Sequence, residues 1–211
     1  MSEQIIRYTL RERVMHWTAG FTYLYLLAGG LAFYAPQLFW IAVLLGGGAT
    51  ARFWHPWAGL LFSAAMVWMD ITWRRDMQIT AEDRRWMKQV SKYIENKDDE
   101  VPPAGRFNAG QKEFYWVMLV GTIGLLLSGL PMWFPESVPR SLGWLRQIAV
   151  IVHEVSALIT IGAFIIHVYM GLLMVPGGFT AIVHGGVPAQ WARKHHRIWF
   201  DRISGGQSAR E

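Results

Sequence analysis

The sequence predicts an all-α integral membrane protein, a four-transmembrane-helix bundle with both termini in the cytoplasm. First, 53% of its 211 residues are hydrophobic and only 17% are charged, fewer charges than a soluble domain of this size carries. Second, long stretches lack charge: residues 14–51 and 114–135 have none, and Glu154 stands alone within 147–192. Each is long enough to cross a hydrocarbon core about 30 Å thick. We therefore expect a single membrane domain over residues 1–211.

The first two predicted spans cover about residues 10–34 and 54–73. Thr9 and Glu12 have the spacing of a capping box, so the first helix should begin before its apolar run. Between the two spans, residues 37–49 are apolar but short, and they close on three glycines. A run of this length is more often interfacial or re-entrant than spanning. If it did span the membrane, every later loop and the tail would be predicted on the opposite side of the membrane.

The later spans cover about residues 114–134 and 146–175, after a polar loop at 74–113 and before a tail at 176–211. Within the loop, residues 83–93 are expected to form a short amphipathic surface helix. Of the 20 Lys and Arg residues, 17 belong to the N-terminus, this loop and the tail. This bias places all three in the cytoplasm of a multi-pass protein of the bacterial inner membrane. Topology and contact with anionic lipid explain the basic residues, so no nucleic-acid partner is expected.

Four histidines can pair at two depths of the membrane, namely His16, His55, His153 and His167. His153 and His167 are 14 residues apart in the last span. That spacing is close to four helical turns, a rise of about 21 Å, so both rings project from nearly the same face. By the predicted helix directions, His55 meets His153 near the periplasm and His16 meets His167 near the cytoplasm.

Histidine pairs at two depths are typical of two stacked haems, each held by two imidazoles. Two axial histidines leave no open position on the iron, which suits electron transfer. The chain has no cysteine, so it can neither attach haem covalently nor hold an iron–sulfur cluster, and the haems should be b-type. A zinc or copper site would gather its ligands at one depth. A lone membrane histidine could instead simply hydrogen-bond a neighbouring helix. His184, His195 and His196 are expected to have ordinary surface or interface roles.

Longer stretches of the chain carry a family resemblance. These are residues 51–59 (ARFWHPWAG), 105–112 (GRFNAGQK), 167–170 (HVYM) and 191–196 (WARKHH), together with Ile6-Arg7-Tyr8 and His16-Trp17. Over essentially its whole length, the chain resembles the cytochrome b556, or gamma, subunits of membrane-bound respiratory formate dehydrogenases. The stretch at 106–112 is the most specific. The tail departs from the family at Arg197, where a proline is common.

The resemblance implies a role in anaerobic respiration. A molybdenum or tungsten catalytic alpha subunit oxidises formate, and an iron–sulfur beta subunit passes electrons to this membrane-anchoring chain, which oxidises no formate itself. Electrons then cross two b-type haems to a quinone, either menaquinone or ubiquinone, which is reduced near the cytoplasmic side. A higher-order oligomer of the heterotrimer is compatible with this role. By the same resemblance, the quinone pocket uses Asn108, Gly110, Gln111 and His167.

Two alternatives remain open at this point. The cytochrome b subunit of a nickel–iron hydrogenase or thiosulfate-type reductase shares the dihaem architecture, and only residues 108–112 and the overall length argue against it. A haem-free membrane anchor or proton-coupled transporter belongs to a different class of protein. Asn108 and Gln111 would also suit a helix cap, as N-cap and N3 residues.

Overall fold

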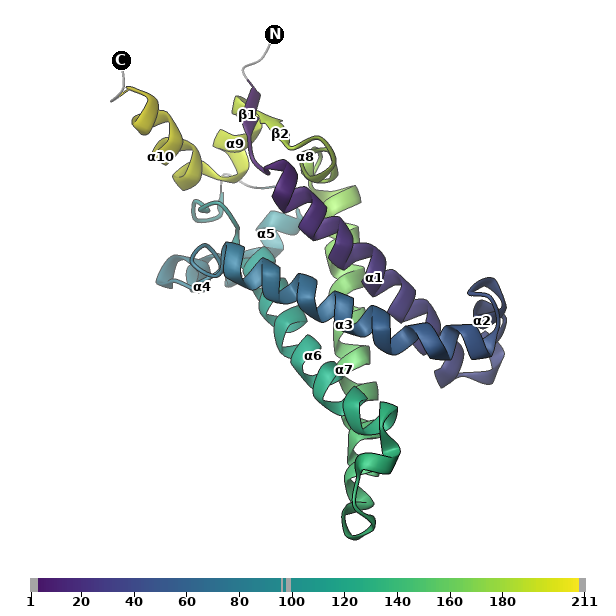
Figure 1. Ribbon diagram of the computed structural model, residues 1–211. Coiled ribbons are helices and arrows are strands. Elements are labelled where there is room, and N and C mark those ends of the chain that lie inside the picture. The colour runs from purple at the N-terminus through teal and green to yellow at the C-terminus, as the bar shows by residue number, and fades with distance from the viewer. Residues whose placement is uncertain (1–3, 96, 98–99, 209–211) are drawn as a thin grey trace. The chain divides into compact units, whose positions relative to one another are not determined.

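The computed structural model describes residues 4–95, 97 and 100–208, which are mainly helical (Figure 1). The long helices are α1 (Leu10–Tyr34), α3 (Gly48–Trp73), α6 (Ala109–Trp133) and α7 (Trp144–Tyr169), the last continued by a π-helical segment, Met170–Met174. With 25 or 26 residues each, they are about 38 Å long, more than the thickness of a hydrocarbon core. Ala109–Trp133 and Trp144–Met174 are also apolar enough to cross a membrane.

The chain forms two compact units. The first unit contains residues 1–13, 72–116 and 164–211, and the second contains 14–71 and 117–163. Each long helix has one end in each unit, and successive long helices run in alternate directions between them. The N-terminus, central loop and tail, which the charge pattern predicts on one side of the membrane, are thus gathered in the first unit. That this side is the cytoplasm stays a prediction.

Within the second unit, α6 and α7 pack closely side by side (Figure 1). A methyl group on Gly121 would overlap the Cγ2 atom of Thr160, and one on Gly124 would lie 2.6 Å from Ser156 Oγ. Small residues at such positions let two helix backbones approach, the usual basis of helix association in membranes.

The segment at residues 37–49 forms only short elements before the next long helix. It contains a 3₁₀ turn, Pro36–Leu38, and the short helix α2 (Trp40–Leu44), and α3 begins already at Gly48. Five helical residues rise only about 7.5 Å. Its short elements agree with the prediction that this segment does not span the membrane, which stays a prediction.

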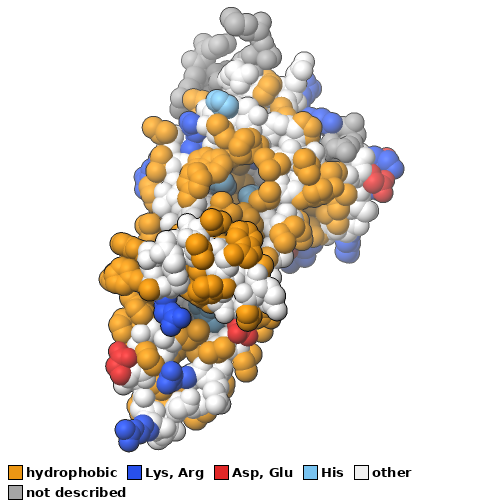
Figure 2. Space-filling model, turned by 90° about the vertical axis from the view of Figure 1, so that its right-hand side faces the viewer, with side chains coloured by type: hydrophobic (Ala, Val, Ile, Leu, Met, Phe, Trp, Pro, Cys, Tyr) orange, Lys and Arg blue, Asp and Glu red, His pale blue; other side chains and the backbone are white. Residues whose placement is uncertain are grey.

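Apolar side chains cover the outward faces of the long helices. On α7 the exposed ones include Ile148, Ile151, Val155, Leu158 and Ile159. Figure 2 shows hydrophobic side chains spread over the drawn face, with few charged ones among them. Such surfaces suit lipid rather than water, since lipid-facing residues need no hydrogen bonds.

The first unit is built from short elements. A two-stranded antiparallel sheet joins β1 (Gln4–Ile6) to β2 (Gly186–Pro188), and five short helices complete the unit: α4 (Ala81–Met87), α5 (Val90–Ile94), α8 (Gly178–His184), α9 (Ala189–His195) and α10 (Arg197–Ser208). The single helix expected over residues 83–93 is therefore two helices. The chain turns between them, where the Gln89 N–H donates to the Trp86 carbonyl at 2.9 Å.

Two long helices begin earlier than the predicted spans, α3 at Gly48 and α6 at Ala109. The prediction followed the apolar run, whereas each helix extends beyond that run toward its N-terminus. The predicted capping box of α1 is confirmed. The Thr9 N–H donates to Glu12 Oε2 at 2.9 Å, and the Glu12 N–H donates to Thr9 Oγ1 at 3.3 Å.

Candidate functional site

The structure brings His55 of α3 and His153 of α7 together within the second unit, with ring centroids 6.5 Å apart. A metal–imidazole bond is about 2.0–2.1 Å long, and the bound nitrogen lies roughly 1.1 Å from the ring centre, so imidazoles on opposite sides of one metal have centroids about 6.4 Å apart. The observed spacing therefore fits one metal ion held between the two rings.

Small residues flank both rings. A methyl group on Gly29 would lie 3.2 Å from His55 Nδ1, and one on Gly129 would lie 3.5 Å from His153 Cε1. His55 Nδ1 is buried and has no hydrogen-bond partner within the described part of the chain. A buried polar atom without a partner is costly in a protein interior, about 1–3 kcal/mol. Glycines packed against both imidazoles and an unsatisfied ring nitrogen together fit a site for a flat metal-bearing group.

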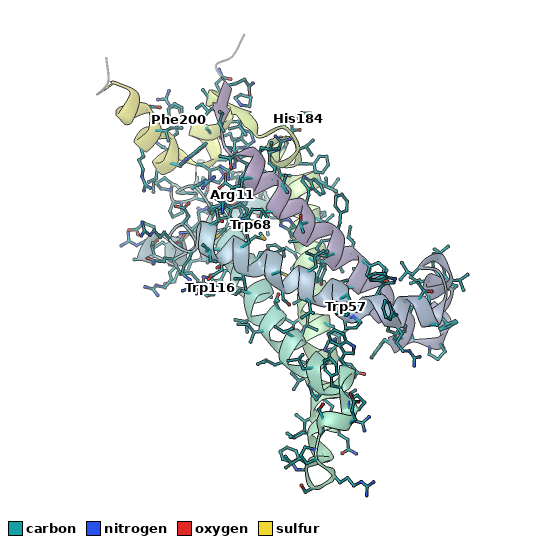
Figure 3. All side chains as sticks on the ribbon, in the orientation of Figure 1. Arg11, Trp57, Trp68, Trp116, His184 and Phe200 are labelled. Atoms are coloured by element: carbon teal, nitrogen blue, oxygen red, sulfur yellow. The ribbon has the colours of Figure 1, made fainter. Side chains whose placement is uncertain are left out.

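Aromatic side chains lie around this pair. Phe33 of α1 meets His55 edge-on at a centroid distance of 5.8 Å. Trp57, labelled in Figure 3, meets Trp133 edge-on at 5.3 Å, which ties α3 to α6. Phe33 thus gives His55 an apolar neighbour, and the tryptophan contact joins the helix of His55 to α6.

The other two predicted ligands lie in different units. His16 of α1 is in the second unit, with its ring edge-on to Trp17 at 5.4 Å. His167 of α7 is in the first unit, where it stacks on Phe114 with centroids 4.2 Å apart and planes 5° from parallel. The pairing of His16 with His167 stays a prediction of the sequence.

The four residues expected at the quinone pocket, Asn108, Gly110, Gln111 and His167, all belong to the first unit. The Asn108 N–H donates to Gln111 Oε1 at 3.0 Å, and the Gln111 N–H donates to Asn108 Oδ1 at 2.9 Å. This reciprocal cap begins α6. Phe114 lies one turn beyond Gln111 and connects this end of α6 to His167 through the stacked rings.

A buried ion pair fixes the same end of α6. Lys112 Nζ lies 2.7 Å from Asp83 Oδ2 and donates to the Gln78 carbonyl at 3.0 Å, and the paired side chains are 8% and 10% exposed. Burial alone would raise the pKa of Asp83. Hydrogen bonds from Lys112 and Thr80, with the lysine charge, outweigh burial and hold that pKa below its usual value. Close by, the Trp116 indole (Figure 3) donates to the Met77 carbonyl at 3.0 Å.

A polar cluster of Arg7, Glu12, Arg106 and His196 holds the loop that precedes Asn108. Arg106 Nη2 lies 2.7 Å from Glu12 Oε1, and Arg7 Nη2 donates to the Arg106 carbonyl at 3.0 Å. His196 completes the cluster, with Nδ1 2.8 Å from the Gly105 carbonyl and Nε2 2.9 Å from Arg7 Nη2. Three segments of the chain thus fix one loop.

His196 corrects the expectation of an ordinary surface role, because it is 2% exposed. Trp191 and Trp199 cover it, and both also lie within 5.4 Å of the Arg7 guanidinium. Burial first, and then the Arg7 charge, lower the pKa of His196 well below its usual value. Two further residues, Ser128, which contacts His153, and Phe114, stand in no recognisable local sequence pattern and were not predicted as site residues.

Two helices of membrane length and two facing histidines point to the class of helical membrane proteins with a histidine site between their helices. The family model of prokaryotic cytochrome b561 matches residues 7–185, and the chain belongs to this family. This agrees with the class defined by the fold and the histidine pair.

Individual relatives show which members of the family the chain is similar to. The chain is 32% identical, over 95% of its length and 94% of the relative, to the cytochrome b556(fdo) subunit of formate dehydrogenase from Escherichia coli (strain K12). It is 30% identical to the formate dehydrogenase cytochrome b556 subunit of Haemophilus influenzae, over 93% of this chain and 82% of that one. It is 26% identical to the nitrate-inducible cytochrome b556(Fdn) subunit of E. coli, over 100% and 96%. The resemblance expected from the sequence is confirmed.

Proposed function

We propose that this chain is the dihaem b-type cytochrome subunit of a formate dehydrogenase, which passes electrons to a quinone and anchors the complex in the membrane. The observation that carries the proposal is the 6.5 Å spacing of His55 and His153, which fits one metal between two imidazoles. Membership of the cytochrome b561 family supports haem as the metal-bearing group. The names of the relatives support formate dehydrogenase as the complex.

His55 and His153 would hold the periplasmic haem, and His16 and His167 the cytoplasmic one. A haem held by these histidines would supply one-electron iron chemistry, for which a pair of histidine ligands is suited. The chain would contribute the ligands, the glycines beside them and the aromatic ring of Phe33 against His55. His153 and His167 are 14 residues apart on α7, a rise of about 21 Å, so the two pairs divide the membrane into two short steps.

The quinone would bind at the start of α6. Reduction of a quinone needs two electrons and two protons, and the first unit is the polar part of the chain, where water can supply the protons. The side-chain oxygens of Asn108 and Gln111 are used in the helix cap. The side-chain amide N–H groups are therefore what these residues can offer a quinone oxygen; one from Asn108 is directed to the Tyr93 hydroxyl at 3.4 Å, which leaves its second N–H.

The proposed formate dehydrogenase complex implies two partner subunits for this chain. An iron–sulfur beta subunit would deliver electrons at the His55 end, after a molybdenum or tungsten alpha subunit has oxidised formate in the periplasm. Electrons would move inward while protons are taken from the cytoplasm. This separates charge across the bacterial inner membrane. Moving one elementary charge across it changes the free energy by about 2.3 kcal/mol for each 100 mV of membrane potential.

Absorption spectra of the purified complex test the proposal. Formate should reduce two b-type haems, and added quinone should reoxidise them. His55→Ala or His153→Ala should remove one haem and block quinone reduction, whereas Asn108→Ala should keep both haems and slow quinone turnover. His184→Ala is the control, because this exposed histidine has no proposed ligand role.

Three results would contradict the proposal. A co-purified partner carrying nickel would favour a hydrogenase instead. Absence of b-type bands after dithionite reduction would exclude haem altogether. Retention of both haems by His153→Ala would refute the ligand pairing.

A further inference from the structure

We propose that Ser128 of α6 selects which nitrogen of His153 binds the haem iron and strengthens that ligand as an electron donor. The inference rests on the proposed function, because it needs a haem between His55 and His153. It adds a positioning residue that acts through His153 and does not itself touch the haem.

The hydroxyl of Ser128 has two close partners. Ser128 Oγ lies 2.6 Å from the Gly124 carbonyl oxygen, one turn earlier in α6, and 2.9 Å from His153 Nδ1 on α7. It also lies 3.3 Å from the Leu125 carbonyl oxygen. Ser128 is 5% exposed, so water does not compete for these bonds.

The number of protons decides the direction of each bond. A serine hydroxyl has one proton, and a carbonyl oxygen can only accept. The bond to Gly124 is the shorter one, at a length typical of O–H···O, so the Ser128 proton goes there. Ser128 Oγ then offers His153 a lone pair, and Nδ1 must be the donor.

This arrangement fixes the tautomer of His153. With the proton on Nδ1, Nε2 keeps a bare lone pair, which is the form of imidazole that binds a metal. A metal-bound histidine that donates its other N–H becomes a stronger donor toward the metal. In contrast, His55 Nδ1 has no hydrogen-bond partner among the described residues. The two axial ligands are therefore unequal, and Ser128 makes His153 the stronger one.

A stronger donor stabilises ferric iron over ferrous iron. Each reduction adds one electron to the iron and changes no covalent bond of Ser128 or His153. Ser128→Ala removes the acceptor while leaving both histidines in place. At a given potential, the ratio of ferrous to ferric iron at this haem should then rise about tenfold, which is 59 mV for one electron. The other haem should keep its potential.

The experiment is a dithionite redox titration of the purified complex, followed at both b-type bands, with electron paramagnetic resonance of the oxidised protein. Ser128→Ala should shift one of the two titrations and the g-values of one low-spin haem. Ser63→Ala is the matched control, because Ser63 Oγ makes the same back-bond along its own helix, to the Gly59 carbonyl at 2.8 Å. This control should leave both haems unchanged.

A pair of variants separates the hydroxyl from packing. Ser128→Thr keeps a hydroxyl and should retain the wild-type potential, whereas Ser128→Val has the same shape without the hydroxyl and should behave like Ser128→Ala. If Ser128→Ala loses the haem, recovery in Ser128→Thr but not in Ser128→Val still supports the inference. Equal behaviour of threonine and valine overturns it, as does a Ser128→Ala protein with unchanged potentials and g-values. Absence of low-spin haem from the wild-type protein would instead overturn the proposed function.

Discussion

Replacing Gly121 with alanine should force α6 and α7 apart, because the added methyl group would overlap Thr160 Cγ2. Thr160 is 1% exposed, and its Oγ1 donates to the Ala157 carbonyl at 2.9 Å, so it cannot turn away without losing a buried hydrogen bond. The contact lies on the two helices that bear Ser128 and His153. Separation of α6 from α7 should therefore also weaken haem retention.

The expected loss of stability is the difference between two opposing free-energy terms. Overpacking a core typically costs about 1–3 kcal/mol, whereas alanine in place of glycine favours a helix by up to about 1 kcal/mol. A net loss of about 1–2 kcal/mol should lower the Tm of a chain this size by roughly 2–8 °C. Thermal unfolding of the detergent-solubilised protein, followed by circular dichroism, measures this shift.

Two further variants make the result specific. Gly162→Ala adds the same methyl group to α7 where no atom lies within 4 Å, and it should leave the Tm unchanged or slightly higher. Adding Thr160→Ser to Gly121→Ala removes Cγ2 but keeps the hydroxyl, so the nearest Thr160 atom to the new methyl is the Cβ at 3.8 Å. The double variant should recover most of the lost stability. A Gly121→Ala protein as stable as wild type, or a double variant no better than the single one, would refute the reasoning.

Two other predictions concern buried charges of the first unit. Lys112→Met leaves the Asp83 carboxylate buried without its cation and should destabilise the protein by about 3–5 kcal/mol, seen as a lower Tm. Adding Asp83→Asn should restore part of this loss, and no recovery would contradict an ion-pair cause. Burial and the Arg7 charge hold the pKa of His196 well below its usual value. As the pH falls through about 6.5, this histidine therefore takes up a proton in the unfolded state but stays neutral in the folded state. Stability should be full above about pH 6.5 and fall below it by up to about 1.4 kcal/mol per pH unit. His196→Gln should flatten this slope, and equal slopes in both proteins would count against the buried neutral histidine.

Local spacing accounts for what the sequence predicted well. The caps Thr9–Glu12 and Asn108–Gln111 depend on residues three apart, and the long helices depend on apolar runs that any bilayer requires. The meeting of His55 with His153 depends only on helix direction and depth, and the structure places those rings together. Their role as haem ligands remains part of the proposed function.

Long-range packing accounts for what the sequence did not predict. Arg7 bonds to Arg106 and His196, which are 99 and 189 residues away, so no local pattern reveals the polar cluster. His196 stands in a basic stretch that reads as surface, but Trp191 and Trp199 bury it. Ser128 is one serine in an apolar helix, and only the facing position of His153 on α7 gives it a role.

The pairing of β1 with β2 has a consequence for how the protein is made. Residues 4–6 are translated before the four long helices, whereas their partners at 186–188 are translated after them. The Arg7 guanidinium likewise gains its contacts with the Trp191 and Trp199 rings only after those residues have been translated. Every residue of the second unit is translated before these partners, so the first unit is completed last. The loop before Asn108 is therefore fixed only after residues 186–196 have been synthesised, so the proposed quinone site takes shape later than the long helices.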